Sequence, residues 1–326
     1  MMRALVTGAN GCLGRSLVPL LLSSGWEVVI LGRPGSDLTF FDESDVRMIV
    51  GDVLEPDSFN KELVGFFDGI FHLAGNGSLW DQNNEFQNQI HIEGTDNLLT
   101  FAAERGCRRF IYVSSYLAWG LQNQILMETL EKKGFESSIN YCGSKHLAEY
   151  KVISATEDGL ESVILNPAQI VGPYDEQNFG QFYRRLAKHQ IPIIPNGLMT
   201  LCHPDAIAQA CLSAWSQGAI GQSYLLGGPT ITYHELAEKI CKTLAIETPR
   251  RAPSLMFHAM GTVNSLLAKI SKREPFLTKE RARLVTSDIK IDDSLAQNEL
   301  GYQPTAMSKI LEDFFDWMES LRRDGL

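Results

Sequence analysis

A glycine-rich turn, TGANGCLG at residues 7–14, is the feature that most constrains how this chain can fold. The turn follows a short apolar run at 3–7 and opens a helical pattern over 13–24. Its three glycines are spaced three apart, so the backbone can approach a pyrophosphate that also faces the N-terminus of the helix. The turn therefore predicts a strand–helix–strand unit that binds a dinucleotide. Outside such a unit, the same glycines would indicate only a turn.

Strand-like and helix-like segments alternate through the first two hundred residues. The expected strands are the apolar runs at 3–7, 27–31, 46–50, 69–73, 109–114, 161–165 and 222–227. The helical patterns Leu13 to Ser24 and Phe86 to Arg105 each end at a glycine, the residue that adopts positive φ at a helix C-cap. This alternation predicts an α/β fold with a Rossmann-type, doubly wound parallel sheet.

The regular alternation lapses after Asn166-Pro167, where proline and glycine become frequent. From about 229 onward the patterns are mostly helical. We expect a dinucleotide-binding domain over 1–170, to which 201–228 returns. The rest, 171–326, is expected to form a smaller, mostly helical substrate-binding lobe.

Composition excludes several classes of function. The chain has 39 acidic and 29 basic residues and no basic stripe, so nucleic acid is not an expected partner. Its six cysteines lack C-x-x-C or metal-ligand spacing, which is typical of a reducing compartment without disulfides or a metal site. The apolar N-terminal run enters the glycine turn instead of a signal-peptide core. The apolar stretch 255–270 is interrupted and shorter than the roughly 20 residues of a membrane span. A cytoplasmic protein without a membrane span is expected.

An arginine stands where NAD-specific sites have an acidic residue, at the end of the second strand. That strand ends in Leu31-Gly32-Arg33. A guanidinium can clamp a 2′-phosphate with two parallel hydrogen bonds, so NADP is favoured over NAD. The alternative is a solvated surface arginine. Asp52 closes the third strand and either accepts a hydrogen bond from the adenine amino group or caps a turn.

A tyrosine and a lysine have the spacing of a proton-transfer pair. Tyr141 and Lys145 lie four apart in a helical pattern, which places the ammonium beside the phenol. A phenol has a pKa of about 10, and a neighbouring positive charge lowers that pKa. Ser115 ends the fifth strand, at the edge where ligands bind in such sheets. Together the three predict a proton relay between a carbonyl and an alcohol.

Eight motifs, in order and spacing, resemble those of the extended short-chain dehydrogenase/reductase family, also called the NAD-dependent epimerase/dehydratase family. They are TGANGCLG at 7–14, GDV at 51–53, HLAG at 72–75, EGTDNLL at 93–99, YVSS at 112–115, YCGSK at 141–145, NPAQIVGP at 166–173 and HPDAIA at 203–208. The resemblance implies that Ser115 polarises the substrate oxygen, Tyr141 transfers the proton, and Lys145 holds the nicotinamide ribose while lowering the tyrosine's pKa. Ser114 takes the serine role if the register is shifted by one.

The motifs and the resemblance together predict a cofactor site, a substrate site and no metal site. The cofactor-binding residues are expected to be Gly8, Asn10, Gly11, Cys12, Leu13, Gly14, Arg33, Asp52, Val53, Leu73, Ala74, Gly75, Ser114, Tyr141, Lys145, Asn166 and Pro167. The expected substrate contacts are Trp80, Ser115 and Gln169.

One residue departs from the family pattern. His91 stands where the family usually has an asparagine before V-x-G-T. That asparagine supports a proton-relay water in related enzymes. Either His91 substitutes for it or the relay differs here, although a lone histidine on a helix is more often a packing or capping residue.

Other positions bear on the branch of the family. Nucleotide-sugar epimerases hold the diphosphate with an arginine and an asparagine where this chain has Met199 and Gln169. A diphosphate without a guanidinium loses its strongest charge-assisted contacts, so a nucleotide-sugar substrate is disfavoured. Dehydratases place Asp-Glu after the catalytic serine, whereas Tyr116-Leu117 follows here. The pattern looks more like dihydroflavonol reductases and hydroxysteroid dehydrogenases, whose substrates are larger and largely apolar.

In that branch, the region matching 254–270 is an apolar helix that lines the substrate entrance or touches a membrane. Its candidate contacts here are Phe257, Met260, Leu266 and Leu267. The interpretation that we favour from the sequence is a plain core helix of the smaller lobe.

We therefore expect an NADP-dependent oxidoreductase that moves hydride between the nicotinamide and a ketone or secondary alcohol. Its substrate would be a mainly apolar small molecule, sterol-, flavonoid- or keto-acid-like. The main alternative is a sugar epimerase that retains NAD(P) tightly. A non-catalytic NADP-binding sensor ranks lowest, because it would not need Tyr141 and Lys145. The resemblance also suggests a homodimer through the helices at about 86–105 and 141–158.

Overall fold

The computed structural model describes residues 1–323 and is built around a seven-stranded parallel sheet. The strand order is β10-β6-β5-β4-β1-β2-β3. The strands are β1 (Met2–Thr7), β2 (Trp26–Gly32), β3 (Val46–Val50), β4 (Gly69–His72), β5 (Arg109–Val113), β6 (Ser162–Pro167) and β10 (Ser223–Leu226). Each of the seven strands predicted from the apolar runs is present. The predicted Rossmann-type sheet is confirmed.

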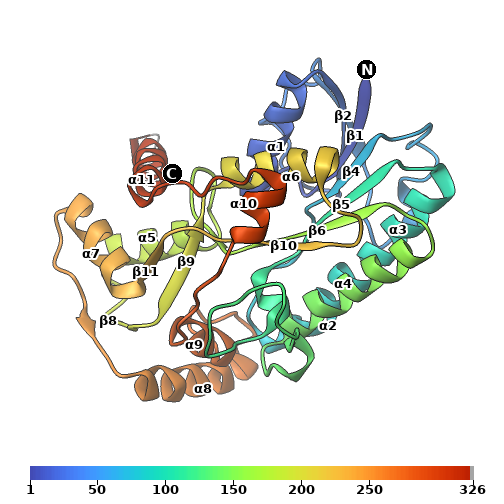
Figure 1. The fold of residues 1–326 in the computed structure, drawn as a ribbon. Helices are drawn as coiled ribbons and strands as arrows, with labels where there is room; N and C mark the ends of the chain where they lie inside the picture. Colours follow the sequence, from blue (N-terminus) through green and yellow to red (C-terminus); the bar gives the residue numbers. More distant parts are fainter. Residues whose placement is uncertain (324–326) are drawn as a thin grey trace.

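Helices cover both faces of this sheet (Figure 1). One layer contains α1 (Cys12–Ser23) and α6 (Pro204–Gln217), which pack against each other and against Val28 and Ile30 of β2. The other layer contains α3 (Gly94–Arg105) and α4 (Asn140–Glu157), whose apolar side chains share a core with the alternate residues of β2. Strand side chains point alternately to the two faces, so a sheet buried on both sides needs the nearly continuous apolar runs seen in the sequence.

A smaller lobe has its own apolar core and lies beside the main sheet (Figure 1). Its helices are α5 (Phe179–Ala187), α7 (Tyr233–Leu244), α8 (Ser254–Ser271), α9 (Lys279–Val285) and α11 (Met307–Arg323). Its short strands are β7 (Gln169–Ile170), β9 (Leu198–Cys202) and β11 (Thr230–Thr232) in one sheet and β8 (Ile193–Ile194) with β12 (Arg250–Arg251) in another. The helix α10 (Ser294–Leu300) packs against α6 and β10. The predicted domain boundaries remain a prediction.

The long helix predicted from Phe86 to Arg105 is interrupted by a wider turn. The segment contains α2 (Asn84–Asn88), the π-helical turn η3 (Gln89–Glu93) and then α3. Short 3₁₀ turns η1, η2, η4 and η5 occur at Pro56–Ser58, Asp81–Asn83, Tyr116–Trp119 and Gly134–Glu136. A π turn inserts an extra residue into the helix and often occurs at functional sites. Here it carries His91.

The prediction that 254–270 forms a core helix is wrong. Along α8, only Phe257, Gly261, Ser265 and Ala268 are buried. Six large apolar side chains are exposed, namely Leu255, Met256, Val263, Leu266, Leu267 and Ile270. The buried residues pack closely on α9, since a Cβ on Gly261 would come within 2.7 Å of the carbonyl oxygen of Thr278, the residue before α9. In residues 1–323, no helix is both long and apolar enough to span a bilayer.

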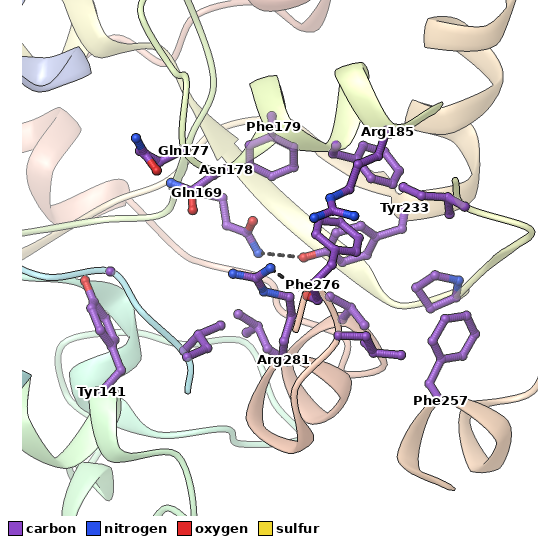
Figure 2. Close-up of a pocket in the computed structure, with 18 of the residues that line it drawn as sticks. Tyr141, Gln169, Gln177, Asn178, Phe179, Arg185, Tyr233, Phe257, Phe276 and Arg281 are labelled. Atoms are coloured by element: carbon purple, nitrogen blue, oxygen red, sulfur yellow. Dashed lines mark hydrogen bonds between the residues drawn. The ribbon is translucent and has the colours of Figure 1, made fainter. Parts of the chain in front are cut away.

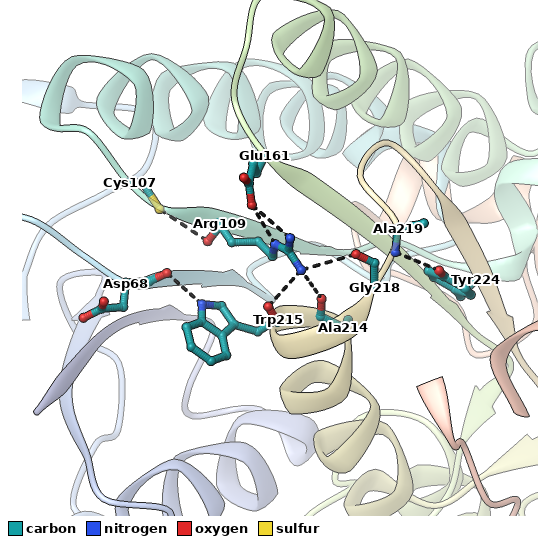
Figure 3. Close-up of polar contacts among 9 residues, drawn as sticks. All are labelled: Asp68, Cys107, Arg109, Glu161, Ala214, Trp215, Gly218, Ala219 and Tyr224. Atoms are coloured by element: carbon teal, nitrogen blue, oxygen red, sulfur yellow. Dashed lines mark hydrogen bonds and ion pairs between the residues drawn. The ribbon is translucent and has the colours of Figure 1, made fainter. Parts of the chain in front are cut away.

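An arginine ties the returning helix α6 to the sheet (Figure 3). The Nη1 of Arg109, at the start of β5, donates to the carbonyl oxygens of Ala214, Trp215 and Gly218 at 3.3, 2.9 and 3.2 Å. These carbonyls lie at the C-terminal end of α6, where backbone acceptors lack helical partners. Glu161 holds the same guanidinium through Nε and Nη2 at 3.2 and 2.9 Å.

Candidate active site

The glycine turn leaves room for a pyrophosphate at the start of α1. Gly8 has φ of +70°, and a Cβ there would lie 2.7 Å from the Ala74 nitrogen. A Cβ on Gly14 would lie 2.3 Å from the Ala9 carbonyl oxygen, so this glycine lets the helix pack against the turn. The N-cap residue Gly11 provides no side-chain cap, which leaves the first-turn N–H groups of α1 facing outward for an anion. The turn therefore fits the diphosphate of NAD(P).

The loop after β4 is held against this turn by a buried histidine. His72 contacts the Thr7 hydroxyl at 2.7 Å and the Thr95 hydroxyl at 3.1 Å, and burial lowers the pKa of its imidazole to about 3. The Ala74 N–H donates to the same Thr7 hydroxyl at 3.3 Å. The loop residues Leu73, Ala74 and Gly75 thus lie next to the glycine turn, as a shared cofactor site requires.

Arg33 and Asp52 follow the carboxyl ends of β2 and β3 and lie in different environments. Arg33 follows β2 and is exposed, and within residues 1–323 its side chain makes no hydrogen bond or ion pair. Its guanidinium is therefore accessible to a ligand. Asp52 accepts a hydrogen bond from the Leu54 N–H at 3.0 Å, so it caps the turn there. This cap is one of the two alternatives for Asp52, and an adenine contact through its other oxygen remains a proposal.

Tyr141 and Lys145 come from the first two turns of α4 and lie beside the end of β5. The Nζ of Lys145 donates to the Val113 carbonyl oxygen at 3.2 Å and contacts the Tyr112 hydroxyl at 3.4 Å. Burial lowers the pKa of Lys145 to about 8, partly opposed by the negative charge of Glu149. Burial raises the pKa of Tyr141 to about 12, and the Ser115 hydroxyl acts in the opposite direction. In the protein alone, burial therefore outweighs the lowering of the tyrosine's pKa that the resemblance implies.

Both candidate serines line the same cavity as Tyr141. The Ser115 hydroxyl accepts from the Leu117 N–H at 3.2 Å and caps η4, which fixes its position. The Ser114 hydroxyl is buried and has no partner among the described residues. The Ser115 hydroxyl also acts to lower the pKa of Tyr141, which is consistent with a position beside the phenol.

A buried polar network behind Lys145 escaped the sequence analysis. Glu149, one turn further along α4, is buried and pairs with Lys132. It also accepts from the side-chain amide of Asn166, which donates to the Ser115 carbonyl oxygen at 3.0 Å. Asn166, expected at the cofactor, therefore uses its amide to hold the backbone of the serine. The signal available in the sequence was the spacing of Lys145 and Glu149, four residues apart on one helix.

His91 is a neutral cross-link between three segments. Its Nε2 accepts from the Asn76 N–H at 2.9 Å, so the proton must lie on Nδ1, which contacts the Ser144 hydroxyl at 2.8 Å. The Ser144 hydroxyl in turn donates to the Tyr141 carbonyl oxygen at 3.0 Å. Burial holds the pKa of His91 well below its usual range. With both ring nitrogens engaged, His91 joins the β4 loop to α4.

A cavity of about 450 Å³ opens above Ser115 and Tyr141 (Figure 2). Most of its wall is apolar and comes from both lobes. The apolar and aromatic lining includes Leu79, Leu117, Pro167, Ile170, Phe179, Phe182, Ile191, Ile194, Phe257, Met260, Phe276, Leu284 and Val285. Polar side chains also reach the cavity, among them Gln177, Asn178, Gln190 and Asn264. A mainly apolar pocket that also contains polar groups is typical of a small-molecule site.

Of the predicted substrate residues, Ser115 and Gln169 line this cavity and Trp80 does not. The Gln169 amide donates to the Tyr233 hydroxyl at 3.2 Å and contacts the Tyr116 hydroxyl at 3.4 Å. Trp80 lies in extended backbone and is buried, while its neighbour Leu79 reaches the cavity. Adjacent residues of an extended chain point to opposite sides, which accounts for the difference.

Two arginines in the cavity wall were missed by the sequence analysis. Arg185 comes from α5 and Arg281 from α9. They lie almost a hundred residues apart, and neither belongs to one of the recognised motifs, so only the folded chain brings them together.

The sequence profile of the NAD dependent epimerase/dehydratase family matches residues 4–227, more than half of the chain. The chain belongs to this family. It is an NAD(P)-dependent oxidoreductase of the short-chain dehydrogenase/reductase type. This agrees with the family that the sequence motifs predicted.

Relatives of similar length match almost end to end. The chain is 26% identical to a "Putative dihydroflavonol 4-reductase" of Synechocystis sp., over 97% of this chain and 94% of that one. It is 29% identical to "Sterol demethylase protein B" of Methylococcus capsulatus, over 97% and 98%. Among solved structures, the crystal structure of gox2253 superposes with a TM-score of 0.84 at 28% identity and covers 98% of both chains.

Proposed function

We propose that this protein transfers hydride between NADP(H) and a ketone or secondary alcohol on a mainly apolar small molecule. The observation that carries the proposal is the apolar cavity directly above Ser115 and Tyr141. Transfer of apolar substrate surface from water to apolar cavity walls is favourable, so such a cavity favours an apolar substrate. The names of the two relatives, a dihydroflavonol reductase and a sterol demethylase protein, are consistent with a substrate of this kind.

NADP(H), when bound, supplies or accepts the hydride, and the residues of the chain manage the proton. Tyr141 donates its phenolic proton to the oxygen formed by reduction of the ketone, or removes it in the reverse direction. The Ser115 hydroxyl, held by the Leu117 N–H, positions that oxygen. The Lys145 ammonium holds the nicotinamide ribose and favours the phenolate after the proton has left.

The cofactor would be bound along the edge formed by the glycine turn, the β4 loop and α4. Gly8, Gly11 and Gly14 would face the pyrophosphate, with Asn10, Cys12, Leu13, Val53 and the loop 73–75 around it. Arg33, exposed at the end of β2, would pair with the 2′-phosphate of NADP. Ser114 and Pro167, in the wall of the cavity, would border the nicotinamide.

The proposal is tested by assaying NADPH oxidation with three mainly apolar carbonyl compounds, a dihydroflavonol, a 3-oxosteroid and a long-chain 3-oxoalkanoate. We expect turnover with at least one of them. Arg33→Ala should weaken NADPH binding by about ten- to a hundredfold, the range for losing a hydrogen bond to a charged group, and leave NADH binding unchanged. Preference for NADH in the wild-type protein, unchanged by Arg33→Ala, would contradict the assignment of the cofactor.

A sugar epimerase with tightly retained NAD(P) is the second candidate. Arg185 and Arg281 favour it, because guanidinium groups are suited to a sugar diphosphate. The apolar lining around them argues against it. Cofactor that survives purification, together with conversion of a UDP-sugar without net change in nicotinamide absorbance, would replace the reductase proposal with this one.

A further inference from the structure

The cavity contains two cations that the protein itself does not neutralise. Within residues 1–323, neither Arg185 nor Arg281 has a carboxylate oxygen within 4.0 Å. Among the described residues, the guanidinium of Arg281 makes one hydrogen bond, from Nη1 to the Phe276 carbonyl oxygen at 2.6 Å, and the guanidinium of Arg185 makes none. A guanidinium has five N–H donors, so most donors of this pair remain unused.

One aromatic ring holds the two guanidinium groups together. The Cζ atoms of Arg185 and Arg281 lie 4.4 and 5.3 Å from the centroid of Phe276. Cation–π contacts fix the direction of each guanidinium but do not cancel its charge. Two like charges beside one ring repel each other, and an anion bound to them would offset that repulsion.

The surroundings make the unpaired charge costly. Both arginines are half-buried in a wall formed by apolar side chains, and burial lowers the pKa of Arg281. The carboxylate that acts on Arg281 from a distance is Glu274, which is exposed and accepts hydrogen bonds from Ser78 and Asn83 instead. A charge in apolar surroundings without a partner is unfavourable, so the site is suited to a ligand that brings the counter-charge.

We propose that the substrate is an anionic amphiphile, an apolar molecule that carries one acidic group bound by Arg185 and Arg281. Figure 2 shows Tyr141 well apart from both guanidinium groups, so the acidic group binds away from the reacting carbonyl. Apolar walls between the two ends take up the body of the molecule. This inference rests on the proposed reductase function and adds the chemical class of its substrate.

Two fluorescent dyes that differ by one charged group test the inference without relying on turnover. The probes are 1-anilinonaphthalene-8-sulfonate, which is anionic, and N-phenyl-1-naphthylamine, which is its neutral counterpart. Both are titrated into the protein saturated with NADPH. Arg185→Gln/Arg281→Gln should weaken binding of the anionic dye by about tenfold or more and change binding of the neutral dye by less than about twofold.

Matched variants separate the pocket from the surface. Arg184→Gln and Arg283→Gln remove the same charge from the same two helices at positions outside the cavity, and we expect both dyes to bind as in the wild type. Arg281→Lys keeps the charge and should retain most of the anionic preference. Thermal unfolding and NADPH binding report whether each variant folds. If the double variant does not fold, Arg185→Gln alone replaces it, and it too should weaken binding of the anionic dye more than binding of the neutral dye.

Competition identifies the kind of anion. Dodecanoate should displace the anionic dye from the wild type at least about tenfold better than methyl dodecanoate does. From the double variant, the two compounds should displace the dye equally well. Equal binding of the anionic dye to the wild type and the double variant would overturn the inference. Displacement by UDP in preference to dodecanoate would overturn it as well, in favour of a nucleotide ligand. Tyr141→Phe should leave dye binding intact, so failure of the reductase proposal and failure of this one give different results.

Discussion

At the scale of single residues, burial sets the protonation states around the proposed site. Lys145 has a pKa lowered to about 8 and Tyr141 a pKa raised to about 12. Each group is thereby pushed toward its neutral form by desolvation. When bound, an oxidised nicotinamide would lower the pKa of both groups through its positive charge, and the cofactor's phosphates would raise both through their negative charge.

Cofactor affinity should depend on pH through Lys145. Below pH 8 the lysine is charged and attracts the anionic cofactor, and as pH rises through about 8 it loses that charge. We therefore expect the Kd for NADPH, measured by fluorescence titration between pH 6.5 and 9.5, to increase above pH 8. Lys145→Met should bind more weakly at low pH and show no such rise. A rise of the same size in Lys145→Met would mean that another group is responsible.

His91 should act by position and not by titration. His91→Ala leaves the Asn76 N–H without its acceptor, and we expect a loss of about 1–3 kcal/mol in the free energy of unfolding together with a lower kcat. His91→Asn retains an acceptor and should recover much of both. The pH profile of kcat should be the same in wild type and His91→Asn. Loss of an ionisation from that profile in His91→Asn would show that the histidine relays protons.

The motif residues could be predicted from the sequence because their spacing is local. Gly8, Tyr141 and Lys145 each belong to a short segment whose turn or helix fixes the geometry. Glu149, Arg185 and Arg281 could not, because their roles depend on contacts with residues of other segments, which only the folded chain brings together. The roles predicted for the site residues remain proposals until they are tested.

At the scale of elements, apolar runs and glycines were sufficient to predict the strands of the main sheet. They were insufficient for η3 and for the exposure of α8, both of which are decided by packing against other elements. The amphipathic pattern of a helix does not specify what covers its apolar face. The predicted homodimer through α3 and α4 remains a prediction for the same reason.

Arg109 clamps the C-terminal end of α6 to β5 through its hydrogen bonds, and this clamp should be important for stability. Arg109→Met removes the hydrogen bonds to the C-terminal end of α6 and leaves Glu161 without its partner. We expect the free energy of unfolding, measured by urea denaturation, to fall by about 1–3 kcal/mol. Arg250→Met, an exposed arginine on β12, is the control and should change it by less than about 0.5 kcal/mol. Equal stability of the two variants would mean that the clamp contributes nothing.

At the scale of the whole molecule, the exposed apolar face of α8 is a candidate for peripheral contact with a membrane. Leu266, Leu267 and Ile270 project from the same helix that contributes Phe257 and Met260 to the cavity. An apolar substrate could thus pass from a lipid surface to the pocket along one helix.

Vesicle flotation tests this contact. The wild-type protein should float with phosphatidylcholine vesicles, and Leu266→Glu/Leu267→Glu should reduce the bound fraction by about tenfold, since burying a charge at the interface opposes insertion. Ile220→Glu, an exposed apolar residue elsewhere, should bind as the wild type does. Binding that is equal in all three proteins would exclude α8 as the contact.

The central claim is that Tyr141 transfers the proton while NADP(H) exchanges hydride with a substrate in the apolar cavity. It is tested most directly by rapid mixing of the NADPH complex with an accepted ketone, in wild type and Tyr141→Phe. We expect NADPH binding to be unchanged and the rate of NADPH oxidation to fall by about 10²–10⁴-fold in Tyr141→Phe, the range for losing a general acid. Oxidation at the wild-type rate in Tyr141→Phe would contradict the account.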